Sequence, residues 1–351
     1  MKMTDDWLLE NQSQERANFQ LAMYATHLAT GSTLHCRAIK SSTIASYLHD
    51  IATFLGRFRP IDPRFVSAAD TTLAPAIAKV LAEQRRWEMV PNRREPFTVE
   101  MHLAIANRSS SHKDDCCLNA AMVNWTLCNL YAGCRGIEWA QTQLIHKPVN
   151  KFHMNRFKNA YAFTLSDVLC FTENSGPLTF AQALAHPLTV GKLKLRFEEQ
   201  KNGQNGEWKL FTKNHSNPHL CFVMHFMRIL ARHKRLTNAS PIQPLSVYRG
   251  TDGTVYNITT VDIDATLRHA AATVYKLDPV THHATLSLWS SHSLRVGACT
   301  LLYSKGFSEM EIKYLLRWKS NAFMTYLRNL AVTSRRQNDA VNDTSEIPNF
   351  V

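Results

Sequence analysis

Residues 289–330 read WSSHSLRVGACTLLYSKGFSEMEIKYLLRWKSNAFMTYLRNL. His292 and Arg295 are three positions apart, so a helix over this part of the stretch carries both on one face. Trp318 and Tyr326 follow, with the short polar break KSN between them. An ordinary helical core does not require this order of residues, so the stretch is a candidate for a functional site.

Helix-start signals divide this stretch into separate helices. Ser290 or Ser291 can cap a helix that ends near Gly306. Ser308 and Glu311 have the spacing of a capping box and predict a second helix, EMEIKYLLR. A third, short helix is predicted over AFMTYLRNL.

The composition indicates a folded, basic protein. The 351 residues are enough for two domains, and 45% of them are hydrophobic. The formal net charge of +12 favours an acidic partner, most commonly nucleic acid. Residues 1–91 hold 10 basic and 9 acidic side chains, which leaves 30 and 19, a net charge of +11, for the remainder. The second part is therefore expected to make most phosphate contacts with DNA.

Membrane, metal and disulfide signals are missing from the sequence. No apolar run approaches the roughly 20 residues that span a bilayer, and MKMTDDWLLE does not resemble a signal peptide. We expect an intracellular protein without a membrane partner, nuclear in a eukaryote and otherwise in the cytoplasm or nucleoid. None of the eight cysteines forms a C-x-x-C pair or pairs with histidine at metal-ligand spacing. Buried free thiols are expected, with no metal and no cofactor.

The first part of the chain is predicted to be helical. Helices are expected over residues 15–30, 43–58 and 75–87 from their apolar periodicity and their Gly and Pro boundaries. The segment VPNRREPF then reads as a linker, so a domain boundary is predicted near residues 91–96.

The second part is predicted to be mainly α-helical with a small antiparallel β-sheet, an α+β fold. Helices are expected over residues 98–107 and 115–131, after Pro218, and after Thr259 or Thr260. Gly133 ends one of them, and Arg135 follows at once in GCRGIEW. KLKLRFEEQ and EWKLFT alternate in hydrophobicity around KNGQNG, which predicts a hairpin with Lys201 at its turn.

Cleaving DNA with an enzyme nucleophile needs four functions. Fixed positive charge binds the scissile phosphate, a hydroxyl attacks it, a base accepts the hydroxyl proton, and an acid protonates the leaving 5′-oxygen. Arginine suits the first function because its fork meets two phosphate oxygens and keeps its charge. Each candidate residue alone is weak evidence for such a site. The order in which these residues follow one another along the chain is the specific evidence.

That order resembles the tyrosine recombinases, the phage-integrase family. GCRGIEW is similar to the family's first arginine box, and HSLRVGACTLLYSKGFSEMEIKYLLRWKSNAFMTYLRN is similar to its second. The resemblance covers about residues 93–330, and RFEEQKNGQNGEWKLF and RWKSNAFMTYLRN are most similar to recombinases of eukaryotic mobile elements such as Cryptons. It implies a helical core-binding DNA-clamp domain over 1–91, a catalytic domain over 92–333 and a polar tail over 334–351.

The resemblance also implies a role for each motif residue. Arg135 and Arg295 would bind the non-bridging oxygens of the scissile phosphate. Lys201 would be the general acid and His292 would help to accept the tyrosine proton. Tyr326 would be the nucleophile and form a 3′-phosphotyrosyl bond.

Other positions leave alternatives open. Trp318 stands where many members have a second histidine, and its indole N–H can still donate to a phosphate. Glu138 lies three residues after Arg135 and would orient it from behind. Alternatives to the predicted acid and nucleophile are Lys194 and Lys209, and Tyr303 and Tyr314, respectively. Delivery of the nucleophile in cis or in trans stays open.

The resulting hypothesis is a site-specific DNA recombinase or integrase that works on double-stranded DNA without metal, as a homotetramer in its synaptic complex. The alternatives are a catalytically silent, recombinase-derived DNA-binding protein and a type IB topoisomerase-like strand transferase. An arginine retained for its charge is expected to be replaceable with little loss of stability, and Arg295→Ala tests this.

Overall fold

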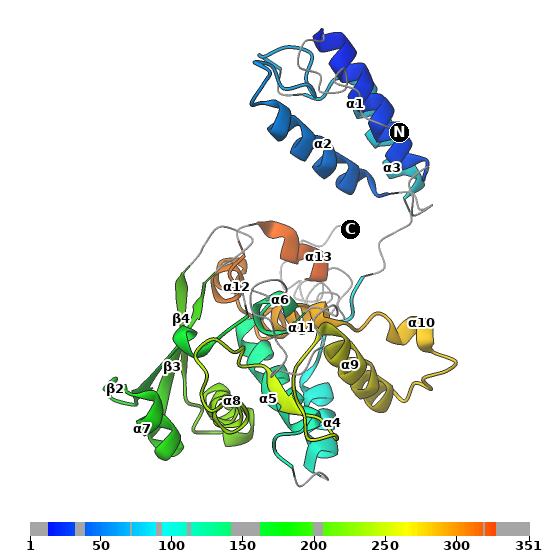
Figure 1. The fold of residues 1–351 in the computed structure, drawn as a ribbon. Helices are drawn as coiled ribbons and strands as arrows, with labels where there is room; N and C mark the ends of the chain where they lie inside the picture. Colours follow the sequence, from blue (N-terminus) through cyan, green and yellow to red (C-terminus); the bar gives the residue numbers. More distant parts are fainter. Residues whose placement is uncertain are drawn as a thin grey trace, which may run out of the picture. The chain divides into compact units, whose positions relative to one another are not determined.

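The computed structural model describes residues 13–31, 39–70, 72–88, 93–110, 114–141, 162–198, 206–318 and 320–327 (Figure 1). The chain divides into two compact units, Met1–Asn92 and Arg93–Val351. The division falls inside VPNRREPF, the segment in which the sequence places a linker. The predicted tail over 334–351 lies outside the described residues.

The described residues of the first unit form three helices, α1 (Gln14–Ala29), α2 (Ser41–Leu55) and α3 (Pro75–Trp87). Ser13 caps α1 by accepting a hydrogen bond from the backbone N–H of Arg16, and Pro75 stands at the first position of α3. Their apolar stripes meet in a small core of Leu21, Ala22, Ala25, Leu28, Ile44, Leu48, Ala74, Ile77 and Leu81. The three predicted helices are thus present, with ends shifted by up to three residues.

The second unit contains most of the helices. They are α4 (Val99–Ser110), α5 (Leu118–Ala132), α6 (Gly136–Trp139), α7 (Phe180–Ala185), α8 (Phe222–Thr237), α9 (Thr260–Tyr275), α10 (His283–Leu286), α11 (Ser291–Ser304), α12 (Glu309–Leu316) and α13 (Met324–Leu327). Short 3-10 turns cover Leu165–Asp167, Pro187–Thr189, Pro218–Leu220 and Asn321–Phe323. The caps at Ser290, Ser308 and Thr259 are confirmed.

The strands form one four-stranded antiparallel sheet and one two-stranded ribbon. The sheet has the order β2 (Pro177–Leu178), β1 (Val168–Thr172), β3 (Val190–Phe197), β4 (Glu207–Thr212). The ribbon pairs β5 (Val247–Arg249) with β6 (Val255–Asn257). The predicted hairpin is β3–β4, with Leu195 opposite Lys209. Its turn, residues 199–205 with Lys201, lies outside the described residues.

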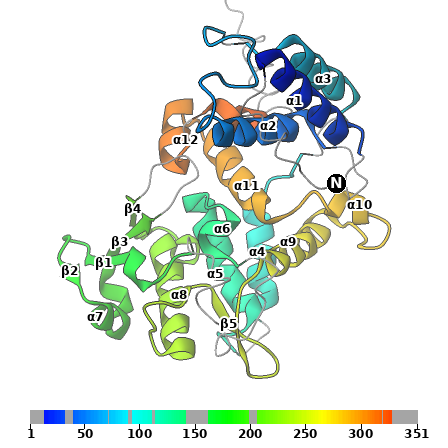
Figure 2. The same cartoon turned by 45° about the horizontal axis from the view of Figure 1, so that its top comes forward.

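Helix α5 lies at the centre of the second unit. It packs against α4, α8 and α11, and Trp125 on it stacks on Trp139 of α6 at a ring distance of 4.9 Å. In Figures 1 and 2 the sheet lies beyond α8 and helix α9 lies on the other side. Most residues of α5 from Ala121 onward are buried, whereas Tyr131 in its last turn is 40% exposed, so the C-terminal end of the helix lies largely inside the unit.

The predicted α+β class is confirmed, and two helix starts differ for local reasons. α5 begins at Leu118 rather than at Asp115, because Asp115 pairs with Arg235 and Asp114 accepts a hydrogen bond from the backbone N–H of Cys116. α8 begins at Phe222, because the residues after Pro218 form a 3-10 turn.

Three histidines are buried in the core of the second unit. His102, His225 and His233 are at most 2% exposed. His102 contacts the hydroxyl of Thr126 at 3.1 Å, and the His102 and His225 rings lie 5.9 Å apart. Burial lowers the pKa of His102 and of His233 to about 4 and that of His225 to about 3.

These histidines predict a loss of stability at mildly acidic pH. Because their folded-state pKa values lie below the ordinary value of 6.5, the neutral rings stabilise the fold fully above pH 6.5 and progressively less as the pH falls toward 4. Lowering the pH from 7.5 to 5.5 is expected to reduce the free energy of unfolding by about 1.4 kcal/mol per buried histidine. Urea titrations at both pH values measure this.

The matched variants are His102→Gln, which should reduce the pH dependence by about a third because two buried histidines remain, and His215→Gln, which should not reduce it. His215 is an exposed residue that pairs with Glu173 on the surface. Equal pH dependence in the parent and in His102→Gln would contradict the assignment.

Candidate active site

Two helix C-termini meet beside α11. α5 ends at Ala132 with Gly133 as its cap, and α12 ends at Leu316 with Arg317 as its cap. A β-carbon on Gly133 would lie 2.6 Å from Leu316 Cδ2, and the φ of Gly133 is 55°, so glycine permits both the turn and the close approach. The last carbonyls of each helix lack intrahelical partners and carry partial negative charge.

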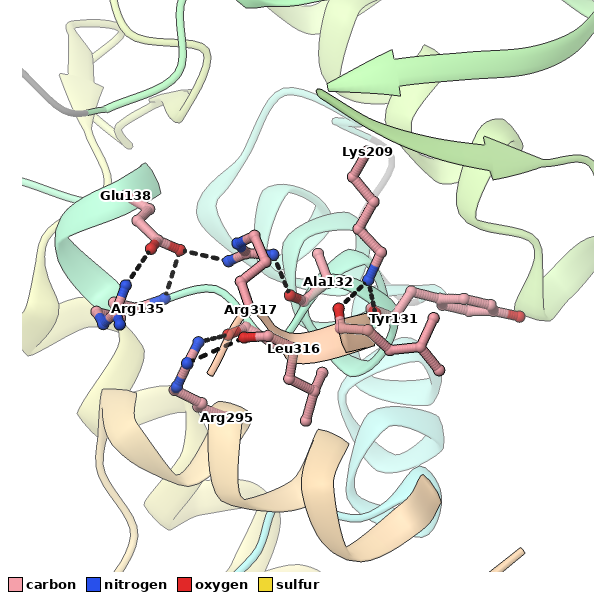
Figure 3. Close-up of polar contacts among 10 residues, drawn as sticks. Tyr131, Ala132, Arg135, Glu138, Lys209, Arg295, Leu316 and Arg317 are labelled. Atoms are coloured by element: carbon pink, nitrogen blue, oxygen red, sulfur yellow. Dashed lines mark hydrogen bonds and ion pairs between the residues drawn. The ribbon is translucent and has the colours of Figure 1, made fainter. Parts of the chain in front are cut away.

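Arg295 of α11 binds carbonyls from both helix ends. Its Nη1 donates to the carbonyl of Gly133, and its Nη2 donates to that of Leu316 at 3.0 Å (Figure 3). The residue is 3% exposed, and among the described residues it forms no ion pair with a carboxylate. Burial and the neighbouring charge of Arg135 lower the pKa of Arg295 to about 9. It remains a cation at neutral pH, with its charge uncancelled by an acid.

Lys209 of β4 lies at the same helix ends. Its Nζ donates to the carbonyl of Leu315 and lies 3.5 Å from that of Tyr131. Burial, with the charge of Arg317, lowers the pKa of Lys209 to about 7. This lysine therefore exchanges its proton near neutral pH.

Glu138 is the carboxylate of the cluster. One oxygen accepts a hydrogen bond from Arg135 Nη1 at 2.9 Å, and the other accepts from the Arg135 backbone N–H at 2.8 Å and from Arg317 Nη2 at 3.0 Å. Arg317 also donates to the carbonyl of Ala132 at 2.9 Å (Figure 3). The carboxylate predicted behind Arg135 is thus placed there, while the involvement of Arg317 was not predicted.

Tyr326 and His292 meet on the open side of the cluster. The hydroxyl of Tyr326, on α13, lies 2.7 Å from His292 Nε2, on α11. Trp318 lies between the parts of the site: its ring centroid is 5.6 Å from that of Tyr326 and 4.8 Å from the Arg295 guanidinium.

The surroundings set the proton states of this pair. Partial desolvation and the charges of Arg295, Arg94 and Arg135 lower the pKa of His292, which retains an exposed edge. Burial raises the pKa of Tyr326, and the charges of Arg295 and Arg135 act in the opposite direction. At neutral pH a protonated phenol therefore faces a neutral imidazole, which is the arrangement that a general base needs.

Two arginines at the start of the second unit secure the neighbouring backbone. Arg93 Nη1 donates to the carbonyl of Thr325 at 3.1 Å, directly before Tyr326. Arg94 Nη1 donates to the carbonyl of Ser287 at 2.6 Å. No local pattern in the sequence predicts these contacts, because they join positions about two hundred residues apart.

The structure separates the alternative lysines. Lys194 lies on the exposed face of β3, with its Nζ 5.5 Å from the Phe171 ring, whereas Lys209 points from the other face toward the helix ends. Lys201 lies outside the described residues. Of the candidate tyrosines, Tyr326 is the one bonded to His292, and Tyr314 is 77% exposed on α12.

Comparison with known proteins found similarity in fold and none in sequence families. No protein-family model and no curated protein sequence matches the chain. Among solved structures, it is similar to the Tn1549 transposon integrase in complex with circular intermediate DNA (TM-score 0.42, 12% identity, covering 94% of this chain and 85% of that chain). It is also similar to the XerA recombinase (TM-score 0.39, 10% identity, covering 94% and 99%). Similarities at this level of identity and TM-score concern the fold and do not assign the chemistry of the site.

No helix in the described part of the chain is both long enough and apolar enough to cross a bilayer.

The contacts of Arg295 change what is expected of Arg295→Ala. Because the guanidinium joins the ends of α5 and α12, its loss is expected to lower the free energy of unfolding by about 3 kcal/mol, since hydrogen bonds from charged groups contribute about 1.5–3 kcal/mol each. Arg228→Ala, at an exposed position of α8, is the matched control and should change stability by no more than about 0.5 kcal/mol. Urea denaturation of both variants measures the free energy of unfolding. If the two substitutions change it equally, Arg295 does not stabilise the fold, and only its charge would account for its presence.

Proposed function

We propose that this chain is a DNA strand transferase of the tyrosine recombinase class, which cuts and rejoins DNA through a covalent bond to Tyr326. The observation that carries the proposal is the 2.7 Å contact between the Tyr326 hydroxyl and His292 Nε2, beside a buried arginine whose hydrogen-bond donors are satisfied by neutral carbonyls. A nucleophile, its base and a fixed cation thus lie together.

The charges favour a phosphodiester as the substrate. Arg295 binds neutral carbonyls and Arg135 shares one carboxylate with Arg317, so the cluster keeps net positive charge. A phosphate diester brings one negative charge, and two guanidiniums match its non-bridging oxygens. The excess of basic residues in the second part of the sequence, a net charge of +11, supports double-stranded DNA as the polymer.

The chemical step follows from the proton states. The Tyr326 oxygen attacks phosphorus, the O–P bond forms, and the phenol proton passes to His292 Nε2. The bond between phosphorus and the 5′-oxygen breaks, and a general acid gives its proton to that oxygen. Arg135 and Arg295 bind the negative charge that grows on the non-bridging oxygens in the transition state. Attack by the released 5′-hydroxyl, or by one from another strand, reverses the step and rejoins DNA.

Lys201 is the proposed general acid, and Lys209 is the alternative. A lysine whose pKa is about 7 gives up a proton readily, which favours Lys209. Its Nζ is already bonded to helix carbonyls, however, so it would have to leave them to reach a leaving group. The order of the motifs supports Lys201.

The finer assignment is a site-specific recombinase or integrase of a mobile element, working without metal as a homotetramer that pairs two duplexes. This assignment is supported by the order of the motifs and by the sequences RFEEQKNGQNGEWKLF and RWKSNAFMTYLRN. Relaxation of single-site plasmids without strand exchange between two sites would instead favour the type IB topoisomerase alternative.

Covalent capture tests the nucleophile. The purified protein is incubated in EDTA with nicked duplexes from the flanks of its own gene, and the products are separated on denaturing gels. The parent should form a protease-sensitive DNA adduct, and Tyr326→Phe should form none while binding DNA as the parent does, because only the attacking oxygen is lost.

Tyr303→Phe and Tyr314→Phe are the matched controls and should capture DNA like the parent. An adduct that persists in Tyr326→Phe would assign the nucleophile to another residue. Tight binding without an adduct in the parent would favour the catalytically silent DNA-binding alternative.

A modified leaving group identifies the acid. Replacing the scissile 5′-oxygen with sulfur creates a leaving group that needs no proton, so a variant lacking only the acid should cleave this DNA at the parent rate. Lys201→Ala is expected to lose roughly 100-fold or more in rate on ordinary DNA and to recover fully on the sulfur substrate. Lys209→Ala is expected to be equally impaired on both. Recovery of Lys209→Ala alone would reverse the assignment.

A further inference from the structure

Arg317 adopts a backbone conformation that is uncommon for arginine. Its φ of 57° lies in the left-handed region, where a β-carbon crowds the backbone and glycine is the usual residue. Such a conformation persists only where the surroundings hold it. The side chain is 0% exposed, so contact with a bound phosphate cannot be the reason for its presence.

The side chain joins three separate elements to the end of α12. Its guanidinium carbon lies 3.4 Å from the ring centroid of Phe197, the last residue of β3. Nη1 donates to the carbonyl of Ala132 at the end of α5, and Nη2 binds Glu138 of α6. The planar fork thus fills a site with a ring, a carbonyl and a carboxylate, which a compact ammonium cannot meet together.

Glu138 transmits this placement to Arg135. The oxygen that accepts from Arg317 also accepts from the Arg135 backbone N–H, and the other oxygen accepts from the Arg135 side chain. Arg135 keeps 25% of its side chain exposed, so it faces outward from a carboxylate that is fixed from behind. Without Arg317, Glu138 would keep its two bonds from Arg135 and lose the bond that ties this pair to the end of α12, so the orientation of the Arg135 side chain would be less firmly fixed.

The backbone at position 317 also places the contacts of Arg295. The carbonyl of the preceding residue, Leu316, accepts from Arg295 Nη2, and the ring of the following residue, Trp318, lies against the same guanidinium. The turn at Arg317 is therefore connected to both arginines, to Arg135 through Glu138 and to Arg295 through the Leu316 carbonyl and the Trp318 ring.

We propose that Arg317 is a positioning residue: through Glu138 it orients Arg135, and through its own turn it orients Arg295, so that the two guanidiniums are aimed at one phosphate before DNA binds. The inference rests on the proposed function, since it assumes that these two arginines bind DNA phosphate.

A double-mutant cycle on DNA affinity tests it without cleavage. Arg317→Met, Arg135→Ala and the pair are made in the Tyr326→Phe background, and binding to one fluorescent duplex is measured by anisotropy. Arg135→Ala is expected to weaken binding roughly tenfold and Arg317→Met at least as much, and the pair should bind no more weakly than Arg317→Met alone, because loss of Arg317 already removes the orientation of Arg135. Arg317→Lys should recover part of the affinity. Parent-like binding of Arg317→Met, or two effects that multiply, would overturn the proposal.

A matched buried arginine separates positioning from general stability. Arg232 on α8 is 4% exposed and donates to the carbonyl of Asp115, with no contact to the site. With Tyr326 present and DNA saturating, Arg317→Met should capture DNA roughly 10–100-fold more slowly than the parent, and Arg232→Met at the parent rate. Equal slowing in both variants would overturn the proposal. If the parent forms no adduct, the proposed function fails, and the affinity cycle still decides the role of Arg317.

Discussion

The site depends on the binding of cations to the C-terminal carbonyls of two helices. A buried guanidinium needs partners, and a carboxylate would supply them at the cost of cancelling its charge. Carbonyls at the ends of α5 and α12 satisfy the donors of Arg295 through partial charges only. The arginine is therefore held firmly and still attracts an anion. The same helix ends also bind Lys209 and Arg317, so the carbonyls at the ends of α5 and α12 together bind three cations.

This arrangement of carbonyls requires that the C-terminal ends of α5 and α12 stay in contact. The packing of the second unit holds them there. Most residues of α5 from Ala121 onward are buried, and Trp125 among them stacks on Trp139. Gly133 removes the β-carbon that would separate α5 from Leu316. A change in the core around α5 would consequently move the carbonyls and, with them, the cations. Two core residues also contact the site directly, because Ala132 provides a carbonyl to Arg317 and the Phe197 ring lies against its guanidinium.

Much of the local structure could be predicted from the sequence, because it depends on neighbouring residues. The capping box of Ser308 and Glu311, the stop at Gly133 and the alternation of β3 and β4 all have short-range causes. The contact of His292 with Tyr326 joins two separate helices, and hydrophobic periodicity does not predict it. Strands β1 and β2 were not predicted, since five and two residues leave little pattern to detect.

Arg317 and Lys209 show where sequence reasoning ends. Both are charged residues in otherwise amphipathic segments, where a solvated side chain is the ordinary expectation. Their burial depends on carbonyls of α5 that lie far away in sequence, and the left-handed turn at Arg317 contradicts the local preference of arginine. Local conflicts of this kind are expected where a fold meets a functional requirement.

Trp318 completes the argument about charge. A histidine here would add a further titrating group, whereas tryptophan presents the face of an aromatic ring to Arg295 at 4.8 Å. That contact stabilises the guanidinium without neutralising it, as the helix carbonyls do. The ring also packs near Tyr326, so the surface that holds the cation limits where the phenol can move. Preorganisation of this kind, in which the charges are oriented before the substrate arrives, is the main way in which a protein stabilises a charged transition state. The uncancelled arginine, the tryptophan face and the neutral histidine therefore form a single electrostatic arrangement.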